Sequence, residues 1–217
     1  MSRFTILTVC TGNVHRSPLA AVLLDRWASW YLPGETASEV VVGSAGTRAP
    51  AGAPMGGRAS RIARALGGEP DGHRARILTD DMIQGADLVL VASRGHRDEI
   101  LSRVPSALRR TFTFREAGRT AAALEQVPEA SDAERLRRIV AALADGRRIA
   151  ADPQDDDVID PQGLGDEAYL RMTAEQVPAL ADLARVLFGM TPGDLEAYRV
   201  AASDPELIAR DGAPGLR

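Results

Sequence analysis

The N-terminal end of the chain carries the clearest change of hydrophobic pattern. Residues 4–9 form a short apolar run with β-branched positions, which is typical of a buried strand. Small and polar residues follow, and apolar positions then recur every third residue up to residue 27, which predicts a helix. Ser17 is a favourable N-cap and Pro18 a favourable first helical residue. The pattern therefore predicts a strand, a tight loop and a helix that begins near Ser17.

The rest of the first half alternates between the same two patterns. Further strands are predicted at residues 39–42, 86–92 and 111–114. Helices are predicted between them, at 55–66, from Thr79 onward and after Ser93. Strands that alternate with helices favour right-handed crossovers, so the sequence predicts a single α/β domain, a doubly wound sheet of about four parallel strands flanked by helices. In such sheets ligands bind at the carboxyl ends of strands.

The second half is mostly helical. Apolar residues at 136, 139, 140 and 143 share one helical face, after a capping box that begins at Ser131. A long closing helix is predicted from Asp166 to Phe188, and Pro178 is expected to kink or split it. Thr191 begins another short helix, and residues 211–215 read as a frayed end. Residues 118–128 are rich in alanine and specify little.

Composition excludes several classes of protein. The 217 residues suit one domain, and the net charge of −4 argues against general nucleic-acid binding. No apolar run approaches a membrane span, and no signal-peptide pattern is evident at the N-terminus. The single cysteine excludes an intramolecular disulfide and fits a reducing cytoplasm. Every cation other than histidine is arginine, so arginine counts say little about function.

The first loop combines a thiol with a guanidinium. Cys10 ends the strand, and Arg16 precedes Ser17 at the start of the helix. Successive loop amides can form a cup for an anion, and the helix adds its positive end at the same place. The guanidinium matches two oxygens of a phosphate, and these surroundings favour a thiolate. A lone cysteine at a strand end is usually a small buried hydrophobe. The arginine and serine favour instead an anion-binding catalytic loop.

The loop also resembles a known family. Residues 10–18, read CTGNVHRSP, are similar to the loop of the low-molecular-weight protein tyrosine phosphatases, with Val14 in place of the usual isoleucine and His15 in place of a second cysteine. The resemblance implies a phosphotyrosine protein phosphatase I-like fold over residues 1–189, with an insertion at about 118–150 and an extension at 190–217. It implies hydrolysis through a cysteinyl-phosphate intermediate, with no metal and no cofactor.

The resemblance also assigns roles along the loop. Cys10 would be the nucleophile and Arg16 would bind the phosphoryl group in the transition state. The remaining loop positions would bind substrate, namely Thr11, Gly12, Asn13, Val14, His15 and Ser17. Ser44 is expected to support Asn13, a residue type that tolerates a left-handed backbone. His73 is expected to brace the loop through Asn13.

The general acid must come from an acidic segment. Residues 151–162 hold five aspartates, most of which are expected to be solvated. A phosphatase of this kind needs one carboxylic acid to protonate the leaving oxygen. Asp160 is the preferred candidate, because Asp160-Pro161 and the residues after it resemble the family's segment. Asp152-Pro153 has the same dipeptide without that sequel.

The substrate and two rival functions stay open. A phosphorylated substrate, possibly a phosphotyrosine protein, is expected, with inorganic phosphate as product and with no nucleic acid or membrane as partner. Gln162 stands where the family usually has an aromatic residue, which weakens the case for phosphotyrosine. One alternative is an arsenate reductase that uses an external small thiol, although Ser17-Pro18 favours a phosphatase. The other is a phospho-ligand binding protein without catalysis.

Overall fold

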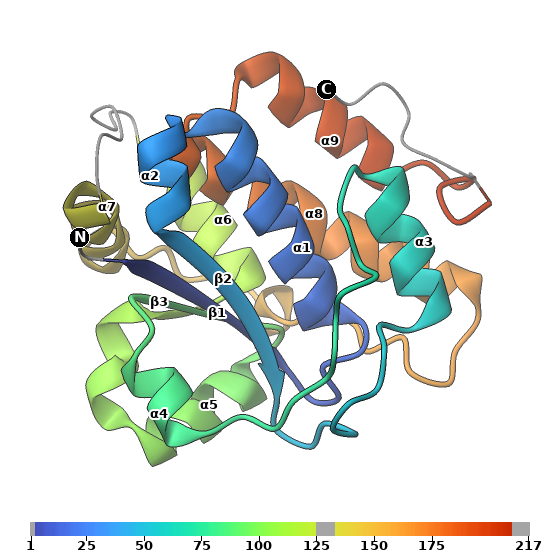
Figure 1. Ribbon diagram of the computed structural model, residues 1–217, viewed down its shortest axis with the longest axis horizontal. Coiled ribbons are helices and arrows are strands. Elements are labelled where there is room, and N and C mark those ends of the chain that lie inside the picture. Colours follow the sequence, from blue (N-terminus) through green and yellow to red (C-terminus); the bar gives the residue numbers. More distant parts are fainter. Residues whose placement is uncertain (1–2, 125–132, 210–217) are drawn as a thin grey trace.

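The chain folds around a four-stranded parallel sheet with the strand order β2-β1-β3-β4. The computed structural model describes residues 3–124 and 133–209 (Figure 1). The strands are β1 (Phe4–Cys10), β2 (Val40–Gly46), β3 (Leu88–Val91) and β4 (Thr111–Thr113). This arrangement confirms the predicted doubly wound α/β sheet.

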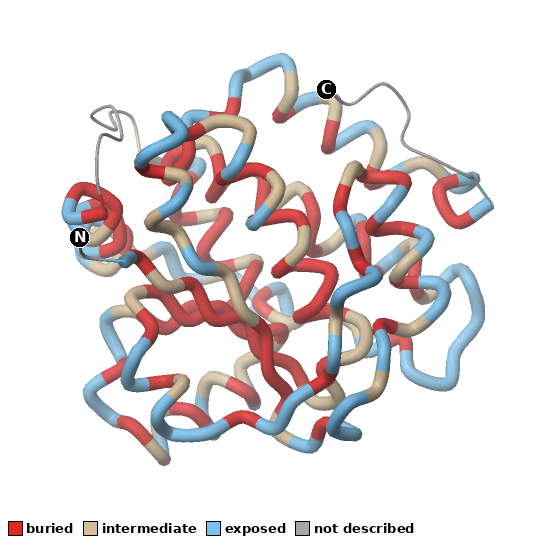
Figure 2. The backbone as a smooth tube through the Cα atoms, viewed as in Figure 1, coloured by how far each residue is buried: buried red, intermediate tan, exposed pale blue. Residues whose placement is uncertain are grey.

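Alternation along the strands divides the core into two layers. One face of the sheet, with Phe4 and Ile6 of β1, joins a large apolar cluster under the helices drawn above the sheet in Figure 1. The other face, with Leu7 and Val9, packs on a smaller cluster that includes Ile100. Successive strand residues point to opposite faces, and each face is covered by one of these clusters. Strand β1 is therefore buried on both sides (Figure 2). Burial of the central strand fixes its carboxyl end, where Cys10 lies.

Helices cover both faces of the sheet. The large layer contains α1 (Arg16–Tyr31), α3 (Gly57–Ala65), α6 (Phe114–Ala122), α7 (Ala133–Asp145), α8 (Asp166–Phe188) and α9 (Pro192–Ala202). The small layer contains α4 (Asp80–Gln84), α5 (Arg94–Arg103) and the 3₁₀ turn η1 (Pro105–Arg110). Two short elements, α2 (Gly34–Glu39) and η2 (Pro153–Asp156), complete the described part of the chain.

Several predicted boundaries need correction. Helix α1 begins at Arg16, with His15 as its N-cap, so Ser17 is not the cap. Helix α6 begins with a capping box between Thr113 and Glu116, inside a stretch from which no helix was predicted. Helix α8 runs as one element past Pro178 and is not split. The predicted capping box at Ser131 and the frayed segment at 211–215 lie outside the described residues.

The C-terminal residues join the main core. Thr191 caps α9, as the sequence predicts, by accepting a hydrogen bond from Asp194 N. The ring of Tyr198 lies edge-on to Trp27 of α1 with a centroid separation of 4.8 Å, and its hydroxyl donates to Leu66 O at 3.3 Å. Both side chains are almost fully buried. Helix α9 therefore packs mainly on α8 and touches α1, the helix that carries Arg16, through this ring pair. Within the described ranges, no helix combines the length and apolarity needed to cross a membrane.

Candidate active site

The loop between β1 and α1 wraps around the sulfur of Cys10. Asn13 has a φ of 52°, and it is the one non-glycine residue with positive φ that the structure describes. This left-handed step turns the chain so that Asn13 N donates to Cys10 Sγ at 3.3 Å. The thiol is 2% exposed. The predicted tight loop therefore places a buried sulfur against a backbone amide of the loop itself.

Ser17 contacts the sulfur directly. Its Oγ lies 3.0 Å from Cys10 Sγ and accepts from Asn13 Nδ2 at 3.0 Å. The hydroxyl hydrogen then has two acceptors in reach, the sulfur and Ala45 O at 3.3 Å. Ser17 does not act as the N-cap that the sequence predicts, because its side chain contacts the sulfur instead. The amides of the loop stay free of a capping side chain, as an anion site requires.

Arg16 joins the loop to the acidic segment. Its side chain is 5% exposed, and its Nη2 lies 2.5 Å from Asp160 Oδ2. Its Nη1 donates to Val158 O at 3.2 Å. The buried Nε has no acceptor among the described residues. The structure thus brings together Arg16 and the preferred candidate for the acid, residues far apart in the sequence.

Asp160 lies in an anchored loop. Asp157 accepts from Arg94 N at 2.7 Å and from Arg94 Nη2 at 3.1 Å. Burial alone would raise the pKa of Asp157, but these hydrogen bonds outweigh it and hold the pKa below its usual value. Asp160 Oδ1 accepts from Gln162 N at 3.2 Å, which orients the carboxylate.

Asp152, the rejected candidate, is used differently. It caps η2 by accepting from Gln154 N at 2.9 Å, and it is exposed. It does not line the pocket that contains Cys10 and Asp160. A local turn therefore accounts for the second Asp-Pro dipeptide.

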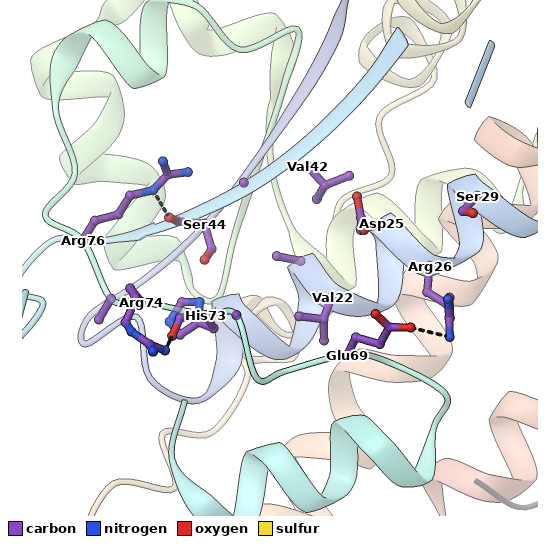
Figure 3. A pocket seen from close by; sticks show the side chains of 14 residues that line it. Val22, Asp25, Arg26, Ser29, Val42, Ser44, Glu69, His73, Arg74 and Arg76 are labelled. Atoms are coloured by element: carbon purple, nitrogen blue, oxygen red, sulfur yellow. Dashed lines mark hydrogen bonds and ion pairs between the residues drawn. The ribbon is translucent and has the colours of Figure 1, made fainter. Parts of the chain in front are cut away.

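Asn13 is braced from behind the loop. His73 Nε2 lies 2.8 Å from Asn13 O, and Arg76 N donates to Asn13 Oδ1 at 2.9 Å. Ser44 does not make the expected bond to Asn13 in the described structure. Its carbonyl oxygen accepts instead from Arg76 Nε at 2.7 Å, as Figure 3 shows. The expected support from Ser44 is therefore indirect, through Arg76, while Ser17 Oγ and Arg76 N are the bonded partners of the asparagine side chain.

A larger hollow lies on the far side of this brace. It has a volume of about 630 Å³ and is lined by α1, the middle of β2 and residues between 69 and 76 (Figure 3). Several of its charged groups have partners: Arg26 pairs with Glu69 at 2.7 Å, and Arg74 donates to His73 O at 2.7 Å. It contains no thiol. The larger of the two cavities is therefore not the candidate active site.

The pocket over Cys10 is smaller, about 280 Å³. Its lining consists of loop residues together with side chains from two neighbouring segments: Cys10, Thr11, Gly12, Val14, His15, Arg16, Arg48, Pro50, Asp160 and Gln162. Asn13 and Ser17 lie beneath it, fully buried. No group of three or more His, Cys, Asp or Glu side chains suited to a metal ion occurs in the part of the chain that the structure describes.

One wall of this pocket is polar. His15 Nε2 lies 2.8 Å from Gln162 Oε1, and the ring of Tyr169 stands edge-on to His15 at 5.2 Å. Burial lowers the pKa of His15, although the Gln162 contact opposes that shift. His15 and Gln162 both differ from the residues usual in the resembling family, and they contact each other. The two differences therefore lie together in one polar wall of the pocket.

Sequence reasoning missed His96. Its Nε2 lies 2.9 Å from Thr11 Oγ1 and its Nδ1 lies 2.6 Å from Ser93 Oγ. A signal was present, because Ser93 ends a predicted strand at the ligand-binding edge and the histidine follows three residues later. A single histidine on a helix gives no indication of its partner in a distant loop.

Comparison with known proteins agrees with this geometry. The family model described as low molecular weight phosphotyrosine protein phosphatase matches residues 5–148, which include Cys10 and Arg16. A protein-arginine-phosphatase from Geobacillus stearothermophilus is 39% identical over 113 residues, which are 52% of this chain and 70% of that protein. A probable low molecular weight protein-tyrosine-phosphatase, EpsP, from Ralstonia solanacearum is 38% identical over 112 residues, covering 52% of this chain and 71% of that protein.

Solved structures agree as well. The YwlE arginine phosphatase from Geobacillus stearothermophilus superposes with a TM-score of 0.57 at 28% identity, over 84% of this chain and 91% of that one. A low molecular weight protein tyrosine phosphatase from T. tengcongensis gives a TM-score of 0.58 at 25% identity, over 83% and 97% of the two chains. The chain therefore belongs to the low molecular weight phosphotyrosine protein phosphatase family, whose members are cysteine-dependent phosphatases.

Proposed function

We propose that the protein hydrolyses phosphomonoesters through a covalent phosphoryl intermediate on Cys10. The observation that carries this proposal is the contact set at the pocket floor, where Cys10 Sγ lies 3.0 Å from Ser17 Oγ and 3.3 Å from Asn13 N. The thiolate is the form that attacks phosphorus, and hydrogen-bond donors and a helix N-terminus beside the sulfur would stabilise negative charge during the reaction. The rival functions, arsenate reduction and binding without catalysis, lose support because the named relatives are phosphatases.

Arg16 would hold the phosphoryl oxygens. Its guanidinium faces Asp160 in the pocket, and its buried Nε lacks an acceptor among the described residues. A buried donor without an acceptor costs free energy, and a bound phosphoryl group would supply one. As the equatorial oxygens gain charge in the transition state, a planar, permanently charged fork stabilises them.

Asp160 would serve as the acid. In the first step the sulfur forms a bond to phosphorus, the bond to the leaving oxygen breaks, and the Asp160 carboxyl group gives that oxygen its proton. In the second step the Asp160 carboxylate takes a proton from water, which displaces the sulfur and releases inorganic phosphate. Ser17 Oγ, 3.0 Å from the sulfur, would stabilise the departing thiolate. At 44% exposure, the Asp160 side chain is accessible both to substrate and to water.

A phosphotyrosine protein is the substrate we propose, on the strength of the family. Phosphoarginine is a second candidate, because the relative from Geobacillus stearothermophilus is a protein-arginine-phosphatase. The described pocket lining contains no phenylalanine, tyrosine or tryptophan that could stack on a substrate ring, which favours this alternative. Two peptides of the same sequence, one with each phosphorylated residue, would separate the candidates by kcat/KM.

The test of the mechanism is Cys10→Ser. The variant should lose at least about 10⁴-fold in hydrolysis of p-nitrophenyl phosphate, as is typical when a catalytic nucleophile is removed. It should still bind inorganic phosphate, because Arg16 and the loop amides remain. Rapid turnover by the variant would refute the proposed mechanism.

A further inference from the structure

A buried imidazole reaches the catalytic loop from the neighbouring strand. His96 lies in the first turn of α5, just after β3, and is 8% exposed. Its ring bridges Ser93 Oγ, 2.6 Å from Nδ1, and Thr11 Oγ1, 2.9 Å from Nε2. Thr11 in turn lines the pocket above Cys10. A continuous polar chain thus connects the cap of α5 to the pocket.

The imidazole is neutral at ordinary pH. Burial, and then repulsion by the Arg16 guanidinium, lower the pKa of His96 to about 4. Asp160 and Asp157 act in the opposite direction, and Arg48 adds to the lowering, but burial dominates. A neutral imidazole has one nitrogen that donates and one that accepts. Its two neighbours therefore decide which nitrogen carries the hydrogen.

Ser93 selects the tautomer. The backbone N–H of His96 donates to Ser93 Oγ at 3.4 Å, as expected at an N-cap. The hydroxyl hydrogen of Ser93 then needs an acceptor, and His96 Nδ1 is the one in contact with it among the described residues. If Nδ1 accepts, the ring hydrogen lies on Nε2, and Nε2 donates to Thr11 Oγ1.

Thr11 is thereby left with a free hydrogen. Arg16 Nη2, which can only donate, also approaches Thr11 Oγ1, at 3.4 Å. The threonine oxygen accepts from both His96 and Arg16, so its own O–H must point to another acceptor. In the pocket that Thr11 lines, a phosphoryl oxygen would be that acceptor.

We propose that His96 is a positioning residue that fixes the Thr11 hydroxyl as a hydrogen-bond donor to the phosphoryl group. The inference rests on the proposed function, since it assumes that a phosphoryl group occupies this pocket. It assigns the Thr11 side chain a part in substrate binding beyond that of the loop amides. It also assigns a positioning role to Ser93 and His96, which lie outside the loop motif.

The experiment is a double-mutant cycle on hydrolysis of p-nitrophenyl phosphate. Thr11→Val removes the hydroxyl and keeps the shape of the side chain, and it should lower kcat/KM by about tenfold to a hundredfold, the usual cost of a hydrogen bond to a charged group. It should weaken inhibition by inorganic phosphate as well. Thr11→Ser, which keeps the hydroxyl, should lose clearly less kcat/KM than Thr11→Val.

His96 should act only through Thr11. His96→Leu should lower kcat/KM by a similar factor in the wild type, and by less than about twofold in the Thr11→Val background. His96→Gln, whose amide nitrogen can still donate to Thr11, should recover most of the activity. This variant keeps the test available if His96→Leu does not fold, which thermal unfolding by circular dichroism would show.

Two results would overturn the inference: a Thr11→Val enzyme with wild-type kcat/KM, or equal losses from His96→Leu with and without the Thr11 hydroxyl. Cys10→Ser, assayed alongside, separates this inference from the proposed function. If Cys10→Ser is inactive while Thr11→Val is unaffected, only the role of His96 is wrong. If Cys10→Ser turns over, the proposed function itself is wrong.

Discussion

The nucleophile loop, residues 10–17, and the acid loop, residues 157–162, meet in one pocket but are built in different ways. Cys10 and Arg16 are 2% and 4% exposed, and they sit between a buried strand and a buried helix. Asp160 has a side chain that is 44% exposed, in a segment without regular secondary structure. In the proposed mechanism the phosphoryl group would therefore bind to a buried element, and its leaving oxygen would be protonated from a surface loop.

The two loops also differ in how their functional side chains are held. In the nucleophile loop, Asn13 and Ser17 bond to each other and to the sulfur, and His73 and Arg76 brace Asn13 from outside the loop. In the acid loop the carboxylates pair with distant arginines, Asp157 with Arg94 and Asp160 with Arg16. Because Arg16 would also bind the phosphoryl group, substrate must compete with Asp160 for it. In the proposed mechanism, the position of Asp160 would therefore depend on what occupies the pocket.

The largest effect expected is from Arg16→Lys. A lysine keeps the charge but loses the planar fork that could hold two oxygens and Asp160, so kcat/KM should fall by roughly 10³-fold. Arg48→Lys, at the rim of the same pocket, is the matched control and should change kcat/KM by less than about fivefold. Steady-state kinetics with p-nitrophenyl phosphate measures both. Equal losses of kcat/KM in the two variants would mean that the buried Arg16 guanidinium contributes no more than the exposed charge of Arg48.

Asp160→Asn should have the next largest effect. Loss of a general acid typically costs about 10²–10⁴-fold in kcat. The control is Asp152→Asn, which removes the carboxylate of the other Asp-Pro dipeptide and should leave kcat within about twofold. Unchanged kcat in Asp160→Asn would mean that another group is the acid.

A smaller effect is expected when the anchor of the acid loop is removed. Asp157→Ala loses the bonds from Arg94, so Asp160 should be positioned less well and kcat should fall by about tenfold. KM should change little, since the nucleophile loop is untouched. Asp155→Ala, which removes an exposed ion pair with Arg115 at 3.5 Å, should leave kcat unchanged. A rise in KM without a loss of kcat in Asp157→Ala would contradict the assignment of phosphoryl binding to one loop and protonation to the other.

The last prediction concerns the stability of the fold and its pH dependence, and it should leave the rate at neutral pH untouched. His96 braces the nucleophile loop with a pKa lowered to about 4, so below about pH 6.5 the unfolded chain binds more protons at this site than the folded chain. The stability that this site contributes is complete above about pH 6.5 and declines toward pH 4, by at most roughly 3 kcal/mol. Asp157 stabilises the fold in its ionised form. Because its pKa is lowered, this contribution to stability is lost only at a pH below the usual aspartate value.

Urea unfolding of wild type and His96→Gln between pH 7 and pH 4 checks this sign. The free energy of unfolding should decline less steeply for the variant. Parallel curves would show that His96 does not titrate in this window.

Prediction from sequence succeeded where the determinants are local. The strand, the loop and the helix around Cys10 are specified by adjacent residues, and a left-handed backbone at Asn13 agrees with its residue type. The order of helices and strands was predictable for the same reason. The start of α1 was misplaced because the capping preference of Ser17 gives way to its contact with the sulfur.

Prediction failed where the determinants are tertiary. Nothing in the local pattern distinguishes Asp160 from the other aspartates of its segment, and the resemblance to a family was needed to prefer it. His96 reaches Thr11 across 85 residues, and Asp160 reaches Arg16 across 144. Ser44 was expected to bond Asn13, but the packing of residues 73–76 puts Arg76 N there. Such contacts appear only when the sheet brings its strand ends together.

Trapping the phosphoryl group tests the central claim most directly. Acid quenching of Asp160→Asn during turnover of p-nitrophenyl phosphate, followed by peptide mass spectrometry, should find the phosphoryl group on the peptide that contains Cys10. The same quench of Cys10→Ser during incubation with substrate provides the control for non-enzymatic labelling. A turning-over enzyme whose phosphoryl group is found on another side chain would contradict the assignment of Cys10 as the nucleophile.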